Sequence, residues 1–251
     1  MEEDLRPNGT QFEGKEEYVK DVFTEIASYY DEMNDLMSMG MIQGWHKFMM
    51  KKAGDLSSKT CLDIGTGTGE IAFLLAENAG EGGKVYGVDI TPKMLELADL
   101  KMKERDIPRP VIFEVGDALS LRFEDGYFDA VTSGYMLRNV TDVQKAINEM
   151  FRVLRPGGRA VVAELSKPDN RFIRFFYNLY MNHRVYWLGK KYGGGKKIDG
   201  REPAYEWLTS SIEGFPHGKE MADKFTKAGF GETKYFVKSF GAVNIYLGIK
   251  K

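Results

Sequence analysis

Residues 62–70, with the sequence LDIGTGTGE, restrict the fold more than any other part of the chain. They follow a short β-type run at residues 60–64 and open a helical pattern of apolar residues. The order is therefore a strand, a glycine-rich turn and the start of a helix. Glycines let a ligand approach the backbone closely, and the first turn of a helix offers unpaired N–H donors. The stretch predicts a ligand-binding turn, although such glycines can also form no more than a tight connection.

The spacing of the glycines favours one class of ligand. Counted from Gly65 and Gly67, the dinucleotide fingerprint G-x-G-x-x-G requires a third glycine where the chain has Glu70. Asp63 and Glu70 border the turn with negative charge, which repels a pyrophosphate and attracts a cation. Asp89 ends the next predicted strand, where an acidic side chain accepts hydrogen bonds from ribose hydroxyls. A ribose, a nearby cation and no diphosphate fit S-adenosylmethionine better than NAD.

The composition sets the broad class of the protein. Hydrophobic residues make up 43% of the 251 residues and charged residues 29%, which is ordinary for a globular protein. A net charge of −2 gives no support for nucleic-acid binding. The single cysteine, Cys61, excludes a disulfide framework, and we expect a buried structural thiol. Because the N-terminus is acidic and no long apolar run exists, we expect a cytoplasmic protein.

Strands and helices alternate along most of the chain. Helices between the strands predict a parallel sheet with right-handed crossovers, and a turn at residues 239–241 predicts a hairpin that makes the last strand antiparallel. Thr91 and Pro92 begin one helix, and Thr141 or Asp142 caps another. A Pro-Gly-Gly turn at residues 156–158 precedes the fifth strand. The seven expected strands are residues 60–64, 85–89, 111–115, 128–133, 159–165, 233–238 and 242–249.

The pattern also predicts how the chain is divided. Residues 1–55 begin with a polar tail over residues 1–15 and continue as helices that form part of a lid. Residues 56–167 form the α/β core that binds the cofactor. Residues 168–217 form a helical cap over the acceptor site, with an aromatic helix, a glycine-rich loop around residues 193–195 and a second helix. Residues 218–251 add a helix and the hairpin that complete the sheet.

In an open α/β sheet, ligands bind outside the carboxyl ends of the strands. Asp117 follows the third strand, where it can accept a hydrogen bond from an adenine amino group or form a solvated turn. Both readings of Asp117 stay open at this point. The candidate cofactor-binding residues are Asp63, Gly65, Thr66, Gly67, Thr68, Gly69, Asp89, Ile90, Met94, Asp117, Ala118 and Gly134.

Arg138 and Asn139 follow the fourth strand and are the candidates for the catalytic side of the site. A sulfonium methyl needs in-line positioning, and the acceptor needs stabilisation of its negative charge. Arg138 can hold an oxygen anion, and Asn139 can orient that oxygen or a water molecule. Glu164 is the candidate for orienting Arg138 or taking the final proton, and the alternative is that both form a structural ion pair. The three histidines lie far apart in the sequence, and we expect no metal site.

Two further features concern the partners. Methionines crowd the N-terminal helices and predict either an adaptable wall for a lipid tail or plain core packing. Residues 171–201 contain eight basic residues against one acidic residue, Asp199. With its aromatic residues this segment can rest peripherally on the inner face of an anionic membrane, or it can be a solvated loop. A homodimer stays open. The methionines are Met33, Met37, Met39, Met41, Met49 and Met50.

Several motifs together resemble one known family. The runs LRNVTD at residues 137–142, RVLRPGGR at 152–159 and ELSKP at 164–168 are similar to those of the ubiquinone/menaquinone biosynthesis C-methyltransferases. The resemblance covers roughly residues 19–230. It implies a class I, Rossmann-like methyltransferase fold, S-adenosylmethionine as methyl donor, and C-methylation of a prenylated quinol ring, typically demethylmenaquinol. It places the acceptor against Arg138 and Asn139, and cofactor contacts on Thr68, Asp89, Asp117, Ala118 and Gly134.

Positions on the acceptor side depart from the family pattern and leave alternatives open. Ile42, Gln43 and Tyr246 stand where the family has other residues. A methyltransferase for another hydrophobic aromatic or phenolic molecule is therefore the second hypothesis. A non-catalytic S-adenosylmethionine-binding partner protein is the third, and a nicotinamide dehydrogenase is the fourth.

Overall fold

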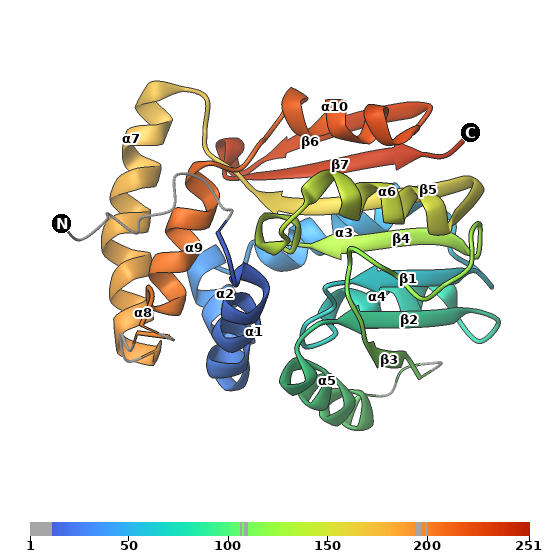
Figure 1. The fold of residues 1–251 in the computed structure, drawn as a ribbon, viewed down its shortest axis with the longest axis horizontal. Coiled ribbons are helices and arrows are strands. Elements are labelled where there is room, and N and C mark those ends of the chain that lie inside the picture. Colours follow the sequence, from blue (N-terminus) through green and yellow to red (C-terminus); the bar gives the residue numbers. More distant parts are fainter. Residues whose placement is uncertain (1–11, 106, 108–109, 194–196, 199) are drawn as a thin grey trace.

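A seven-stranded sheet forms the centre of the protein (Figure 1). The computed structural model describes residues 12–251 except residues 106, 108–109, 194–196 and 199. The strand order is β3-β2-β1-β4-β5-β7-β6, and in the described chain β7 alone runs in the opposite direction to the other strands. The predicted mostly parallel sheet with an antiparallel last strand is confirmed. The strands are β1 (Thr60–Ile64), β2 (Lys84–Asp89), β3 (Ile112–Val115), β4 (Phe128–Gly134), β5 (Leu154–Leu165), β6 (Glu232–Lys238) and β7 (Val243–Ile249).

Helices cover both faces of the sheet, as expected for parallel strands that are buried on each side. α6 (Val143–Val153) and α10 (Lys219–Ala228) pack in one hydrophobic cluster, and α3 (Ile42–Ala53) and α4 (Glu70–Ala79) pack in the other. Asp142 caps α6 by accepting a 2.9 Å hydrogen bond from the Lys145 backbone. Cys61 is fully buried in β1, and burial raises its pKa to about 12.

A second group of helices forms a layer beside the carboxyl ends of the strands (Figure 1). A hydrophobic cluster that includes Tyr18, Met33, Leu188 and Trp207 joins the N-terminal helices to the cap helices. None of the helices among the described residues has the length and hydropathy needed to cross a membrane. The helices of this layer are α1 (Lys15–Ile26), η1 (Ala27–Tyr29), α2 (Tyr30–Ser38), α7 (Arg171–Leu179), the π-helix η3 (Tyr180–Val185), α8 (Tyr186–Gly193) and α9 (Ala204–Glu213).

The cap contains more helix than the sequence predicts. Instead of a loop after residue 180, the chain continues through η3 and α8 as far as Gly193. Gly189 is a poor helix former, but a Cβ there would lie 2.5 Å from Tyr205, so the glycine permits close contact with α9. Tertiary packing thus overrides the weak helix propensity. The predicted glycine loop falls largely outside the described residues.

Three other local predictions need correction. The predicted tail is wrong at its end, because Lys15 begins α1 and is 1% exposed, whereas residues 1–11 lie outside the described part. The turn at residues 156–158 belongs to β5, whose register against β4 shifts between Phe128 and Ala130. Thr91 stands at the N-cap of α5 (Pro92–Glu104) without a side-chain cap. The side chain of Asp89 instead accepts a 2.8 Å hydrogen bond from the backbone amide of Thr91, the N-cap residue.

Candidate functional site

The carboxyl ends of β1, β2 and β4 and the turn after β3 meet at one cleft. Counted with the part that is open to solvent, the cleft spans about 770 Å³. On the sheet side it is lined by backbone and side chains of the strand ends, and on the other side by Glu16, Val19 and Phe23 of α1. Eight of the predicted cofactor-binding residues line this cleft, and they are Gly65, Gly67, Asp89, Ile90, Met94, Asp117, Ala118 and Gly134.

The glycine turn has the backbone conformation that only glycine adopts without strain. Gly65, Gly67 and Gly69 have φ values of 68°, 55° and 90°. A Cβ on Gly65 would lie 2.4 Å from the Met136 side chain, so a larger residue would displace the neighbouring strand end. The Gly65 amide donates to the Val88 carbonyl at 2.8 Å, which ties the turn to β2. This hydrogen bond and the three glycines define the path of the turn at the carboxyl end of β1.

Asp89 is held in the cleft by two backbone donors. Its Oδ2 accepts from the Gly67 amide at 2.8 Å and its Oδ1 from the Thr91 amide at 2.8 Å. Burial raises the pKa of Asp89, and the backbone hydrogen bonds oppose that rise. Asp117 makes a similar local contact, with its Oδ1 accepting from the Leu119 amide at 2.8 Å. Asp117 therefore forms the predicted turn and also lines the cleft.

The other predicted cofactor residues do not line the cleft, which corrects the expected acidic border of the turn. Asp63 is 1% exposed inside the sheet and accepts a 2.7 Å hydrogen bond from Thr132, and burial raises its pKa to about 7. Glu70 forms ion pairs with Lys101 and Arg105 at 2.8 and 2.6 Å. The Asp63 carboxylate is therefore hydrogen-bonded inside the sheet, and the Glu70 carboxylate belongs to an ion-pair network.

The remaining members of the turn are also used structurally. Thr68 donates a 2.6 Å hydrogen bond from its hydroxyl to Asp31 of α2, and Lys101 forms an ion pair with the same carboxylate. Thr66 and Gly69 lie in the turn but are absent from the cleft lining. The N-terminal helices are therefore attached to the glycine turn through Asp31.

A second and larger cavity adjoins the first. It lies between the N-terminal helices, the cap helices and the ends of β5 and β7, and it spans about 1730 Å³ when the part open to solvent is counted. Phe23, Tyr30 and Tyr135 line both cavities, so the two spaces meet at these aromatic rings. Most of the remaining wall is aliphatic, aromatic or methionine side chains. Such a space suits a large hydrophobic molecule whose reacting end reaches the cofactor cleft.

The six methionines of the N-terminal helices lie in two different environments. Met37, Met39 and Met41 line the larger cavity, as a lipid-binding wall requires. The others, Met33, Met49 and Met50, are buried in the hydrophobic clusters and serve core packing.

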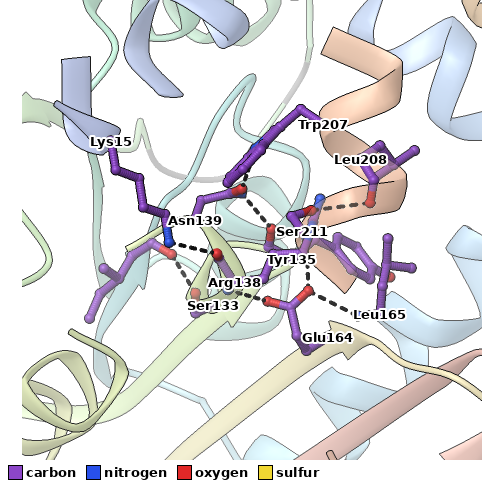
Figure 2. Close-up of polar contacts among 11 residues, drawn as sticks. Lys15, Ser133, Tyr135, Arg138, Asn139, Glu164, Leu165, Trp207, Leu208 and Ser211 are labelled. Carbon is purple, nitrogen blue, oxygen red and sulfur yellow. Dashed lines mark hydrogen bonds and ion pairs between the residues drawn. The ribbon is translucent and has the colours of Figure 1, made fainter. Parts of the chain in front are cut away.

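Arg138 is both a member of a buried ion pair and part of the larger cavity (Figure 2). Its Nη1 donates to Glu164 Oε1 at 2.8 Å and also to the Tyr135 carbonyl. Its backbone amide donates to Glu164 Oε2 at 3.3 Å, and Leu165 donates to Oε1 at 2.9 Å. Glu164 is 1% exposed and absent from the lining of either cavity. Among the described residues, the Arg138 Nε is buried without a hydrogen-bond partner.

Asn139 lines the cofactor cleft and is absent from the lining of the larger cavity. Its Oδ1 accepts a 3.1 Å hydrogen bond from the Trp207 indole of α9, and its Nδ2 donates to the Tyr135 carbonyl at 3.3 Å. Both ends of the amide are therefore used to hold the cap against the strand end (Figure 2).

Sequence reasoning missed Tyr135 and Trp207, which line the larger cavity, and Lys15, which contacts the segment that carries Arg138. Tyr135 has a positive φ of 59°, and its hydroxyl is buried without a hydrogen-bond partner in the described part of the chain. Its position directly after β4 is a signal that could have identified it. Trp207 belongs to a helical pattern that reads as ordinary packing, and Lys15 gives no local signal at all.

Lys15 joins the first turn of α1 to the segment that carries Arg138 (Figure 2). Its Nζ donates to the carbonyls of Arg138 and Val140 at 3.1 and 2.6 Å. Burial lowers the pKa of Lys15 to about 7, and the charge of Arg138 adds to that effect. The lysine therefore couples the helix over the cofactor cleft to the arginine of the larger cavity.

We expect Lys15 to make the stability of the protein rise with pH. Above pH 7 the folded state releases the proton of Lys15, whereas the unfolded chain keeps it up to the ordinary pKa of 10.5. The unfolded state then binds more protons, so the free energy of unfolding increases, by up to about 1.4 kcal/mol per pH unit. In urea unfolding at pH 7, 8 and 9, the free energy of unfolding of the wild type should rise relative to that of Lys15→Met. The exposed Lys20→Met variant on the same helix should show no such trend. If the free energies of unfolding of the wild type and Lys15→Met differ by the same amount at every pH, Lys15 does not link stability to pH.

The fold defines the class of protein. A solved S-adenosylmethionine-dependent methyltransferase from Aquifex aeolicus superposes with a TM-score of 0.57 at 18% identity, covering 81% of this chain and 89% of that one. Phosphoethanolamine N-methyltransferase 2 from Haemonchus contortus, solved with S-adenosyl-L-methionine, gives a TM-score of 0.59 at 18% identity and covers 82% of this chain and 52% of that one. The chain has the class I fold of S-adenosylmethionine-dependent methyltransferases, as predicted.

The family follows from the sequence comparison. Residues 11–250 match the model of the ubiE/COQ5 methyltransferase family. A demethylmenaquinone methyltransferase from Lactococcus lactis is 39% identical over 94% of this chain and 90% of its own. A 2-phytyl-1,4-naphtoquinone methyltransferase from Nostoc punctiforme is 34% identical over 90% of this chain and 96% of its own. The chain belongs to the ubiE/COQ5 methyltransferase family, and it is an enzyme that uses S-adenosylmethionine.

Proposed function

We propose that this enzyme transfers a methyl group from S-adenosylmethionine to a ring carbon of a prenylated quinol, with demethylmenaquinol as the substrate and menaquinol as the product. One observation carries the proposal: a large apolar cavity meets the cofactor cleft at three aromatic rings and holds a guanidinium in its wall. The cavity has room for a fused ring and part of a tail. The Lactococcus lactis relative, a demethylmenaquinone methyltransferase, supports the same substrate.

The residues of the cleft fit the methyl donor, which supplies an electrophilic methyl group on a cationic sulfur. Asp89 is aligned by two amides to accept hydrogen bonds from the ribose hydroxyls. Asp117 is placed to accept from the adenine amino group, with Ala118 beside it. Gly65, Gly67 and Gly134 allow the ligand to approach the backbone.

The acceptor side depends on Arg138. A quinol oxygen that carries negative charge makes the neighbouring ring carbon nucleophilic, and the guanidinium stabilises that charge. The ring carbon takes the methyl group as the carbon–sulfur bond breaks, the demethylated donor leaves, and the same carbon then loses its proton to water. Both Glu164 oxygens are occupied by Arg138 and Leu165, and the carboxylate lies outside the cavities. Glu164 is therefore a positioning residue for Arg138 and not the group that takes the final proton. Asn139 positions the cap through Trp207.

A second substrate class rests on the variety of the relatives. The Nostoc punctiforme relative carries the name of a phytylated naphthoquinone, so one framework serves naphthoquinones with different tails. Another hydrophobic phenol would use the same cavity and the same arginine. The length of the tail distinguishes these substrates, because a simple phenol leaves most of the apolar wall uncovered.

Methyl transfer to a set of acceptors tests the proposal. The protein is incubated with labelled S-adenosylmethionine and, in separate reactions, demethylmenaquinol, 2-phytyl-1,4-naphthoquinol or a simple phenol, and products are identified by mass spectrometry. We expect demethylmenaquinol to gain one methyl group on the ring carbon and the phenol to react far more slowly. Methylation of the phenol at an equal rate, or no reaction with any prenylated quinol, would reject the proposed substrate.

A further inference from the structure

The outer face of the cap helices is an unusual surface. Phe172, Phe175, Phe176 and Leu179 lie on one face of α7, and they are 72%, 64%, 52% and 47% exposed. Tyr186 and Trp187 of α8 are also exposed. Figure 1 shows α7 and α8 at the edge of the molecule that lies farthest from the sheet. Large exposed aromatic clusters of this kind mark binding surfaces. These six residues are named the aromatic face.

The charge around the aromatic face has one sign. Between Arg171 and Gly193 the sequence contains no aspartate and no glutamate, although the whole chain carries a net charge of −2. The Lys190 ammonium lies 5.8 Å from the Tyr186 ring, and that of Lys191 lies 5.3 Å from the Trp187 ring. The basic residues of this segment are Arg171, Arg174, Arg184, Lys190 and Lys191. Aromatic rings flanked by cations match the interface of an anionic bilayer.

The aromatic face is continuous with the larger cavity. Ile173 and Tyr177 of α7 and Met181 of η3 contribute to the cavity wall, and Phe176 is half exposed while it also lines the cavity. Phe240, which is 82% exposed, lines the cavity from the β6–β7 turn. A chain that leaves the cavity past Phe176 would therefore emerge at the aromatic face.

We propose that the aromatic face docks on an anionic lipid bilayer, so that a tailed substrate passes from the bilayer into the larger cavity. The identity of that substrate rests on the proposed function, whereas the docking rests on the surface itself. A second copy of the chain fits this face less well. A two-fold contact across α7 would set the cations of one copy against the same cations of the other, with no acidic residue in the segment to separate them.

Vesicle sedimentation without any substrate tests the docking. The full chain is mixed with vesicles of phosphatidylcholine alone, or of equal parts phosphatidylcholine and phosphatidylglycerol. We expect binding to the anionic vesicles that weakens with salt, and a loss of apparent affinity of about tenfold or more in the double variant Phe172→Ser/Phe175→Ser. Leu100→Ser, which is 54% exposed on α5, is the matched control and should bind as the wild type does. Lys190→Gln/Lys191→Gln should weaken binding to the anionic vesicles only.

The docking and the proposed function fail in different ways. Phe172 and Phe175 do not line either cavity, so methylation of a short-tailed, water-soluble quinol should be unchanged in their double variant. Methylation of a long-tailed quinol held in vesicles should fall. Vesicle binding without methylation of any quinol would leave the docking intact and reject the substrate. Docking is overturned if the wild type does not sediment with anionic vesicles, if the serine variant binds equally well, or if that variant instead converts a dimer to a monomer in solution.

Discussion

Arg138→Ala is expected to reduce methyl transfer by about two to three orders of magnitude while S-adenosylmethionine stays bound. The reason is that the guanidinium lies in the wall of the larger cavity, whereas the cofactor cleft is lined by other residues. The same change leaves Glu164, which is 1% exposed, without its counter-charge. Leaving one partner of a buried ion pair uncompensated costs about 3–5 kcal/mol of stability.

A second variant separates the catalytic loss from the stability loss. Replacing a buried ion pair by hydrophobic residues of similar size is often neutral for stability. Arg138→Met/Glu164→Leu should therefore recover part of the unfolding free energy that Arg138→Ala loses, because the backbone amides of Arg138 and Leu165 still lose their acceptor, and yet remain as inactive. Urea unfolding gives the stability, calorimetry with S-adenosylmethionine gives the cofactor affinity, and the labelled-donor reaction gives the rate. Methyl transfer near the wild-type rate in the double variant would show that Arg138 is structural alone.

Those parts of the fold that depend on local pattern could be predicted from the sequence. The strands of the sheet are continuous β-type runs, and the turns between them carry glycine, proline or aspartate. The positions of the strands along the chain and the final hairpin therefore follow from the spacing of these runs. Asp89 and Asp117 could be placed at the site for the same reason, because the carboxyl ends of parallel strands meet at one edge. The cleft is therefore largely readable from single segments of the chain.

Contacts between distant segments could not be predicted. Lys15 and Arg138 are 123 positions apart, and no pattern around Lys15 indicates that its ammonium is buried against that segment. The hydrogen bond between Trp207 and Asn139 joins residues 68 positions apart. The sequence around Glu70 does not indicate that its charge is paired, because its partners, Lys101 and Arg105, come from α5 and its C-terminal end. Sequence spacing locates the strand ends, but packing decides which polar groups remain available to a ligand.

Asp89→Ala is expected to weaken the binding of S-adenosylmethionine by about a hundredfold or more, because two charge-assisted hydrogen bonds to the ribose are lost. The change also removes the acceptor of the Gly67 and Thr91 amides, so the hydrogen bonds that join Asp89 to the glycine turn and to the start of α5 are lost. Asp89→Asn keeps one acceptor oxygen, so its affinity for S-adenosylmethionine should lie between those of Asp89→Ala and the wild type. Asp117→Ala, which removes a single contact to the base, should cost about tenfold.

Titration calorimetry with S-adenosylmethionine and with its demethylated product measures these affinities. The matched control is Asp223→Ala, because Asp223 is an exposed aspartate on α10 that pairs with Lys219 and lies outside the cleft. Its affinity should equal that of the wild type. An Asp89→Ala variant that binds both compounds normally would mean that the cleft at the strand ends does not hold the ribose. The assignment of Gly65, Gly67 and Asp117 to the same ligand would then fail with it, since all of them line one continuous space.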